Sequence, residues 1–482
     1  MASVSLYTKT AFGIGQVAEG IKSGAFNYFL FFFYSQVLGL SGTVTGGALF
    51  IATLFDAVTD PVAGSFSDRF RHRWGRRHPF MYASAVPLGI TFALLFNPPS
   101  DLSQAATAAW LVVFTVLVRG SMTLYHVPHL ALGAELSSDY TERTTIVAFR
   151  TLFGLVGVGG TFVISFLVFF DATPEFARGQ LNPDAYPAFG LAFGLVMIVS
   201  VLLSALGTHD QIPRLPQPSD SAGPISLRAI FEDYAAALHN PHFRAFLIGI
   251  VIFFITRGIQ EVLAVHMSTY FWVLDADQIA IVGGAGVPGF ILGVPLWTAV
   301  GRRLDKRPTF LAGLVGFVAF VMLPPMAKLV GFYPAQESPL YLGILVTCGF
   351  LGAFCAAAAI VMAGSMMADT ADEHELRTGA RQEGIFFGAL AFAAKSTSGL
   401  GSLLAGVGLD LMAFPTQAAP EDVPESKVVS LGIFYGPGIA ALAVVAISFL
   451  RRYGIDRERH AEIVAALEQR RGSRPMGSTP ME

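Results

Sequence analysis

Long apolar segments alternate with short polar loops along almost the whole chain. A membrane-spanning helix needs about 20 mostly apolar residues, and twelve segments of this kind can be placed. The longest polar interruption, 208–242, is rich in proline and divides the segments six and six. The pattern predicts an all-α polytopic membrane protein built from two six-helix bundles. The predicted transmembrane helices cover residues 11–39, 44–66, 78–97, 104–133, 145–170, 186–207, 243–273, 278–300, 308–331, 338–367, 384–412 and 430–451.

The same pattern predicts how the chain is organised. We expect an N-terminal bundle over 1–207, a cytoplasmic linker over 208–242, a C-terminal bundle over 243–452 and a cytoplasmic tail over 453–482. The first apolar stretch is too long for the apolar region of a signal peptide, so we interpret it as the first transmembrane helix. The tail is charged and then rich in Gly, Ser and Pro, and is expected to fray.

The basic residues predict the orientation. Lys and Arg gather in cytoplasmic loops. They are abundant after the second and eighth predicted helices and at the start of the tail, whereas the loops at 98–103 and 274–277 have none. Both termini are therefore expected in the cytoplasm, with the protein in a bacterial inner membrane.

Composition supports a membrane location. Hydrophobic residues make up 53% of the chain and charged residues only 13%, against about 25% charged in soluble domains. The two cysteines, Cys348 and Cys355, lie in one apolar helix and are interpreted as small core residues. No zinc or haem spacing is present, so no cofactor is expected. The expected partners are the lipid bilayer and a small-molecule substrate, with no nucleic acid, and the chain is expected to be a monomer.

Two carboxylates lie inside the second predicted helix. Asp56 and Asp60 are four residues apart, which places them on one face. Charges at this depth cost about 2.5–3.5 kcal/mol and are functional candidates. Two such carboxylates repel each other unless a proton or a cation lies between them. The pair could therefore hold Na⁺ or a transferable proton; the alternative is two structural carboxylates in salt bridges.

Other predicted helices also contain charged or polar side chains. Arg257 and Glu261 are one turn apart and could simply neutralise each other. Lys395 has no charged partner on its own helix, so it must meet a carboxylate across the bundle or lose its proton. Charges from both halves would then converge at mid-depth, as in an alternating-access transporter. The candidate substrate-binding residues are Glu19, Lys22, Tyr125, His126, Arg150 and Lys395.

A short motif is repeated in the two halves. The second helix ends in a motif whose members are Gly64, Asp68, Arg69, Arg76 and Arg77, and the eighth helix ends in a similar run, 301–307. This loop resembles the cytoplasmic signature of the major facilitator superfamily. An Asp at a helix end beside a basic turn could act as a charge latch on a gate. Positive charge at the cytoplasmic surface alone would explain the arginines, but neither Asp68 nor the glycine spacing.

Two blocks carry a closer resemblance. The run 56–61 with the basic loop after it, and a second block that includes Asp369, Asp372, Arg381 and Glu383 and leads to Lys395, resemble the glycoside–pentoside–hexuronide:cation symporters. The resemblance covers nearly the whole membrane domain. It implies the major facilitator fold and further latch residues in the second block.

The resemblance also implies two sites. A cation site would use Asp56, Asp60 and Thr123, and a sugar site would lie among the first, fourth, fifth and eleventh helices, with Arg150 and Lys395 at family positions. The family's acid on the fourth helix is replaced here by His126. Histidine exchanges a proton near neutral pH, which favours H⁺ over Na⁺ as the coupling ion.

The sequence leaves other cargoes open. The protein is expected to be a sugar or glycoside symporter, but a lysolipid or another amphipath, or drug efflux on the same scaffold, would need a similar set of charges. No HExxH or GxSxG motif is present, and Asp56 and Asp60 lie on one helix, so an intramembrane enzyme is not expected.

Overall fold

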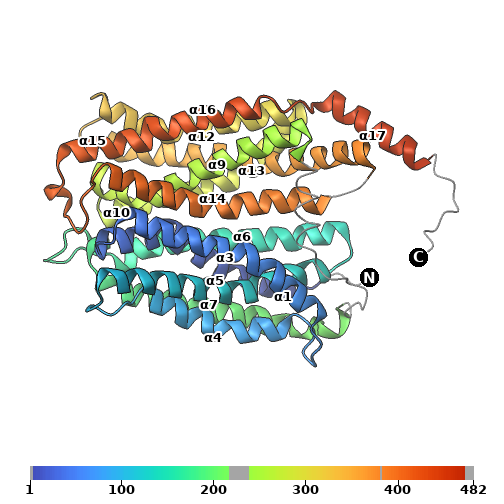
Figure 1. Ribbon diagram of the computed structural model, residues 1–482, viewed down its shortest axis with the longest axis horizontal. Coiled ribbons are helices and arrows are strands. Elements are labelled where there is room, and N and C mark those ends of the chain that lie inside the picture. The colour runs from blue at the N-terminus through green and yellow to red at the C-terminus, as the bar shows by residue number, and fades with distance from the viewer. Residues whose placement is uncertain (1–3, 216–237, 380–382, 473–482) are drawn as a thin grey trace.

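The computed structural model describes residues 4–215, 238–379 and 383–472, and this part of the chain is helical, without strands (Figure 1). Within it, ten helices or joined helices are long and apolar enough to cross a membrane. They are α3 (Gly42–Arg69), α4 (His78–Leu95), α5 (Gln104–Glu135), α6 (Tyr140–Ile164) with η3 (Ser165–Phe169), α7 (Ala185–Gly207), α9 (Pro241–His266) with η6 (Met267–Phe271), α10 (Ala276–Gly284) with α11 (Gly286–Arg303), α12 (Lys306–Leu329), α13 (Pro339–Thr378), and α15 (Glu425–Ile433) with η8 (Phe434–Gly438) and α16 (Ile439–Leu450).

The other two predicted spans are helical as well. The eleventh is α14 (Glu383–Leu411). The first is divided into α1 (Leu6–Ile14), α2 (Gln16–Gly24), η1 (Ala25–Leu30) and η2 (Phe33–Val37). Short 3₁₀ turns lie in connections at η4 (Gly179–Leu181), η5 (His209–Arg214) and η7 (Pro420–Asp422).

Side-chain caps fix several helix starts. Ser41, Ser103 and Ser338 each accept a hydrogen bond from a backbone N–H in the first turn of α3, α5 and α13. Asp275 forms a capping box with Gln278 at the start of α10. These caps satisfy N–H groups that have no partner within the helix, so the starts fall close to the predicted boundaries.

Two segments differ from the prediction. The tenth span was expected to end near residue 367, but α13 continues to Thr378, so Asp369 and Asp372 are helical rather than in a loop. The tail was expected to fray, but α17 (Arg457–Gly472) is a helix whose Ile463 and Leu467 are buried against the C-terminal half. In both segments, contacts with other elements stabilise a helix that the local sequence alone does not predict.

The helices form two halves that lie one above the other in Figure 1, with α1–α7 in one and α9–α16 in the other. The halves meet mainly where α3 packs along α14, and η1 also contacts α9. Lipid-facing surfaces are apolar: a stripe at four-residue spacing along α7 is exposed, comprising Leu191, Leu195, Val199 and Leu203. A bilayer solvates such a stripe, whereas water would not.

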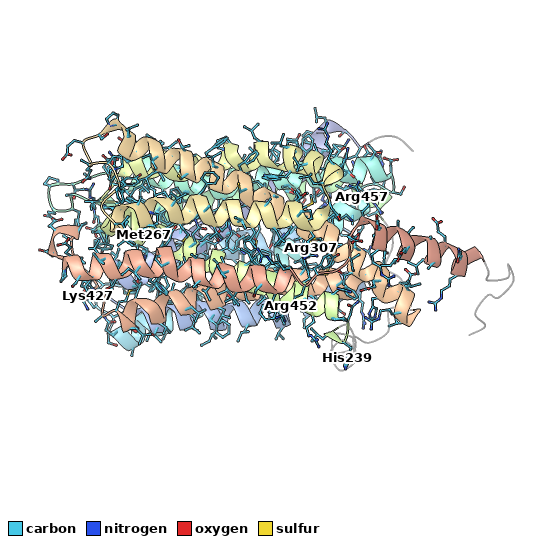
Figure 2. The ribbon with its side chains drawn as sticks, turned by 90° about the horizontal axis from the view of Figure 1, so that it is seen from above. His239, Met267, Arg307, Lys427, Arg452 and Arg457 are labelled. Atoms are coloured by element: carbon cyan, nitrogen blue, oxygen red, sulfur yellow. The ribbon has the colours of Figure 1, made fainter. Side chains whose placement is uncertain are left out.

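One end of the bundle is rich in basic residues. Arg307, Arg452 and Arg457 lie toward the same end, which we call the basic end, and Met267 and Lys427 lie toward the opposite end, which we call the far end (Figure 2). The helices α1 and α17 both lie at the basic end (Figure 1).

The contact between α3 and α14 gives a test of how closely the halves must approach. A Cβ on Gly46 would lie 2.4 Å from the backbone oxygen of Ser402, whereas a Cβ on the adjacent Gly47 would meet nothing within 4 Å. Overpacking costs about 1–3 kcal/mol. We expect Gly46→Leu to lower the thermal unfolding midpoint in detergent and Gly47→Leu to leave it nearly unchanged. Equal midpoints for the two variants would contradict this packing.

Candidate functional site

A ladder of side chains joins α3 to α5. Asp56 and Asp60 are one turn apart on α3, and Arg119 and Thr123 are one turn apart on α5. Asp56 forms an ion pair with Arg119, while Asp60 accepts a hydrogen bond of 2.8 Å from the hydroxyl of Thr123. Residues four apart share one face of a helix, so the Asp56–Arg119 and Asp60–Thr123 contacts together fix the rotation of α3 against α5.

Lys395 reaches this ladder from the other half. It lies near the middle of α14, and its ammonium group forms an ion pair with Asp60. The sequence predicted that this lysine either meets a carboxylate across the bundle or loses its proton, and in this conformation it meets Asp60. The Lys395 side chain remains 51% exposed, so the pair borders an open space. Asp60 is thus a point where the two halves meet inside the membrane.

Asp56 and Asp60 do not form the isolated acidic pair that the sequence indicated. Each has a basic partner, because a carboxylate inside the membrane is costly without a counter-charge. The alternative of two salt-bridged carboxylates therefore describes this conformation. One oxygen remains available: Asp56 Oδ1 is buried and accepts no hydrogen bond from the described residues.

A second polar group lies between α2, α5 and α6. Glu19 forms an ion pair of 2.8 Å with Lys22 and lies 3.8 Å from Nδ1 of His126. Arg150 is partly buried on α6, and its guanidinium has no ion-pair or hydrogen-bond partner in the described part of the chain. The group therefore combines one carboxylate acceptor with several donors and an excess of positive charge, and we call it the N-half polar group.

Two of the predicted substrate residues occupy unexpected positions. His126 was placed near Asp56 and Asp60 by sequence reasoning, but its imidazole lies beside Glu19. Tyr125 is completely buried, its ring stacks on His129 at 5.1 Å, and its hydroxyl packs beside Gly15. Tyr125 therefore offers no surface to a substrate in this conformation.

A third polar group belongs mainly to the C-terminal half. Arg257 and Glu261 pair at 2.8 Å on α9, as their spacing suggested, and Asn27 of η1 donates a hydrogen bond of 3.0 Å to Glu261. Beside them lies a cavity of about 480 Å³ that Cys348 also lines. The spacing predicted that Arg257 and Glu261 could neutralise each other, but nothing in the sequence indicated that Asn27 connects them to the N-terminal half.

The predicted latch of the N-terminal half is closed around Arg77. This arginine is 4% exposed and pairs with Asp68 at 2.6 Å and with Glu135 at 2.7 Å, while Arg76 pairs with Glu135 at 2.8 Å. Gly64 lies beside Val127 of α5, 3.5 Å from where a Cβ would be. Sequence analysis missed Glu135. The signal for it was the need of two adjacent arginines for a buried counter-charge.

The second block, where further latch residues are predicted, forms a separate cluster of ion pairs in the C-terminal half. Asp369 pairs with Lys306 at 2.6 Å, and His460 of α17 lies 3.3 Å from Asp369 and 3.2 Å from Asp372. Arg381, predicted to belong here, lies outside the described residues. Glu383 begins α14, but its side chain also lies outside the described part.

The two halves are joined at the far end by direct hydrogen bonds. Asp410 of α14 accepts hydrogen bonds of 2.8 Å from the backbone N–H groups of Gly42 and Thr43, at the start of α3. A carboxylate is stabilised at a helix N-terminus, where the N–H groups are free. Tyr270 donates to Gln36 at 3.1 Å in the same region. The latch ion pairs, in contrast, join elements within one half. This conformation is therefore closed at the far end.

A family model described as MFS/sugar transport protein matches residues 11–457. The chain belongs to this family. The match confirms the resemblance to the glycoside–pentoside–hexuronide:cation symporters within the major facilitator superfamily. The nucleoside transporter NupG, whose crystal structure is 12% identical in sequence, superposes with a TM-score of 0.61 over 92% of this chain and 99% of its own. That likeness supports the major facilitator fold.

Relatives within the family are transporters. The uncharacterized symporter sll1374 of Synechocystis sp. is 24% identical over 96% of each chain. The isoprimeverose transporter of Lactiplantibacillus pentosus is 24% identical over 95% of this chain and 91% of its own. A sodium-dependent lysophosphatidylcholine symporter of Danio rerio is 22% identical over 95% of this chain and 87% of its own. The protein is thus a multi-pass membrane protein and a secondary transporter that works by symport, not an enzyme.

The two acidic partners of Arg77 differ in burial, and this difference can be tested by substitution. The Glu135 side chain is 11% exposed and that of Asp68 is 51% exposed. Removing the buried partner leaves the charge of Arg77 poorly compensated, which costs about 3 kcal/mol, whereas an exposed pair contributes less than about 1 kcal/mol. We expect Glu135→Gln to lower the thermal unfolding midpoint clearly more than Asp68→Asn does. The reverse order would show that Arg77 depends on Asp68 instead.

Proposed function

We propose that the protein transports a glycoside together with Na⁺ by alternating access of its two halves. The observation that carries this proposal is the ion pair between Asp60 of α3 and Lys395 of α14. It joins the two halves inside the membrane and lies in contact with open space. The relative named an isoprimeverose transporter supports a sugar-containing substrate, and the relative named a symporter supports coupled transport.

Coupling follows from competition for Asp60. Its carboxylate needs a counter-charge inside the membrane, and Lys395 supplies it here. A small cation could replace the ammonium group, using Asp60, the hydroxyl of Thr123 and the free Oδ1 of Asp56 as oxygen ligands. Lys395 would then be released toward the substrate space. Binding of the cation would in this way prepare the substrate site.

The structure favours Na⁺ over the proton that the sequence suggested. A histidine beside the aspartates would favour H⁺, but His126 lies beside Glu19. The groups around Asp56 and Asp60 that remain as ligands are oxygens, which hard cations prefer. Relatives named sodium-dependent symporters agree with this choice.

The N-half polar group is proposed to bind the sugar. Arg150 presents a planar guanidinium without a partner among the described residues, which suits two neighbouring hydroxyls. Glu19 would accept hydroxyl protons, and Lys22 and His126 would complete the polar wall. Lys395, once released from Asp60, would join them from the other half.

A second cargo class is supported by the cavity beside Arg257, which is mostly apolar and would suit the chain of a lysolipid. The lysophosphatidylcholine symporters among the relatives carry such amphipaths by name. We also propose that the basic end faces the cytoplasm of a bacterium, because Lys and Arg favour that side. Both termini would then be cytoplasmic, and the chain is proposed to act as a monomer.

The proposed role of Asp60 in cation coupling can be tested with the Asp60→Asn variant in proteoliposomes. Each charge moved inward supplies about 2.3 kcal/mol per 100 mV, roughly 50-fold accumulation. We expect the variant to lose Na⁺-driven accumulation but to keep substrate exchange, because the cavity remains. Asp101→Asn, in an exposed loop, is the control.

The Lys395→Ala variant tests whether Lys395 and Na⁺ compete for Asp60. Removal of the competing ammonium should lower the half-saturation concentration for Na⁺ about tenfold while uncoupling transport. Substrate-induced alkalinisation of an unbuffered medium, unchanged when Na⁺ is left out, would instead identify H⁺ as the coupling ion.

The proposed sugar-binding roles of Arg150 and Glu19 can be tested by conservative and truncating substitutions. Arg150→Ala should raise the apparent KM for the transported glycoside at least tenfold, whereas Arg150→Lys should lose less, because it keeps the charge but not the planar donors. Glu19→Gln should weaken binding as well. Unchanged apparent KM values in both Arg150→Ala and Glu19→Gln would exclude the N-half polar group as the sugar site.

A further inference from the structure

A cavity of about 480 Å³ lies between the two halves, beyond the residues assigned to the sugar. One side is formed by η1 and α6 of the N-terminal half and the other by α9 to α13 of the C-terminal half. Its volume falls in the range of about 300–1,000 Å³ that small-molecule sites occupy. The two halves move relative to each other in alternating access, so a site between them changes shape in every transport cycle. A molecule bound in it would therefore be carried through the cycle together with the substrate.

The walls of the cavity are mostly apolar. They include Phe162, Val287, Phe290, Phe317, Val321 and Leu345. A sugar hydroxyl buried against such walls would lose its hydrogen bonds to water without replacement, which is costly. An apolar group would gain free energy by leaving water there. The cavity therefore selects against a free sugar and in favour of an aryl or alkyl group.

The charged side chains that line the cavity neutralise each other. Arg257 is paired with Glu261, which also accepts a hydrogen bond from Asn27. A phosphate headgroup binds most strongly to an arginine that is free to form charge-assisted bonds, and Arg257 is engaged. The cavity therefore suits an uncharged ligand.

The cavity and the N-half polar group follow each other in the same order along two helices. The first span carries Lys22 and then Asn27, and α6 carries Arg150 and then Leu155, with both helices running from the basic end. Five residues of helix rise about 7–8 Å. The polar group and the cavity are thus about one sugar ring apart along both helices.

We propose that this cavity binds the apolar aglycone of the transported glycoside, so that the substrate is a sugar carrying an aryl or alkyl group rather than a free sugar. The proposal rests on the proposed function and narrows its substrate class. The sugar ring would contact Glu19, Lys22 and Arg150, and the aglycone would extend into the cavity toward the far end.

Cys348 is a natural reporter for this proposal. It lines the cavity, whereas Cys355, the other cysteine of the chain, is buried. The wild-type protein in proteoliposomes is treated with N-ethylmaleimide, and the two sites are separated by peptide mass spectrometry. We expect phenyl glycosides to slow alkylation of Cys348 at least fivefold and methyl glycosides of the same sugars to have little effect, with Cys355 as the internal reference.

Uptake kinetics give a second measurement. Ala264 lines the cavity, and Ala441 is exposed on the outer surface of α16. Ala264→Phe should raise the apparent KM of a phenyl glycoside at least tenfold more than that of its methyl counterpart, and Ala441→Phe should change neither.

The outcomes separate this proposal from the one on which it rests. Uptake of methyl and phenyl glycosides with equal apparent KM, and no protection of Cys348, would overturn the aglycone site and leave glycoside symport standing. Protection of Cys348 by lysophosphatidylcholine, with neither glycoside transported, would overturn glycoside symport and keep the cavity as the site of an apolar chain.

Discussion

The ion pair between Asp60 and Lys395 is the constraint on which the rest of the site depends. Both charges lie inside the membrane, where an uncompensated charge is costly, and they come from different halves. Any motion that separates the halves at this point must supply each charge with another partner. In the proposed mechanism a cation serves Asp60, and polar groups of a substrate serve Lys395. A transporter that works in this way would not complete its cycle freely with only one of the two bound, which is the requirement for symport.

The helix α3 connects this pair to both ends of the molecule. Its first N–H groups are capped by Asp410 of α14 at the far end, its middle carries Asp56 and Asp60, and its last turn carries Asp68 of the latch. The rotation of α3 about its own axis is fixed by α5, because Asp56 and Asp60 both contact side chains of that helix. A tilt of α3 against α14 would change the Asp410 cap and the Asp60–Lys395 ion pair together, whereas Asp68 and Arg77 belong to the same half. In the proposed mechanism, a cation bound at Asp60 would therefore also alter the contact between the halves at the far end.

Sequence reasoning was accurate where a single helix determines the answer. The twelve segments follow from apolar length, the pairing of Arg257 with Glu261 follows from helix spacing, and the need of Lys395 for a carboxylate follows from its depth. It failed where the rotation of one helix against another decides. Nothing local indicates that Arg119 neutralises Asp56, or that His126 faces Glu19. The roles proposed for these residues in binding remain predictions.

The repeated motif shows the same limit at the level of the two halves. In the N-terminal half, Asp68 pairs with Arg77 of the same loop. Its counterpart Asp305 has a φ of 140°, which is unusual for a residue with a side chain, and its carboxylate accepts hydrogen bonds from the backbone N–H groups of Lys306 at 2.6 Å and Arg457 at 3.2 Å. The second of these belongs to α17. The first copy also depends on Glu135 of α5, with which Arg76 and Arg77 both pair, and the second copy depends on a helix that follows the last membrane span. The repeat thus marks where a latch is predicted, but its partners are set by the rest of each half.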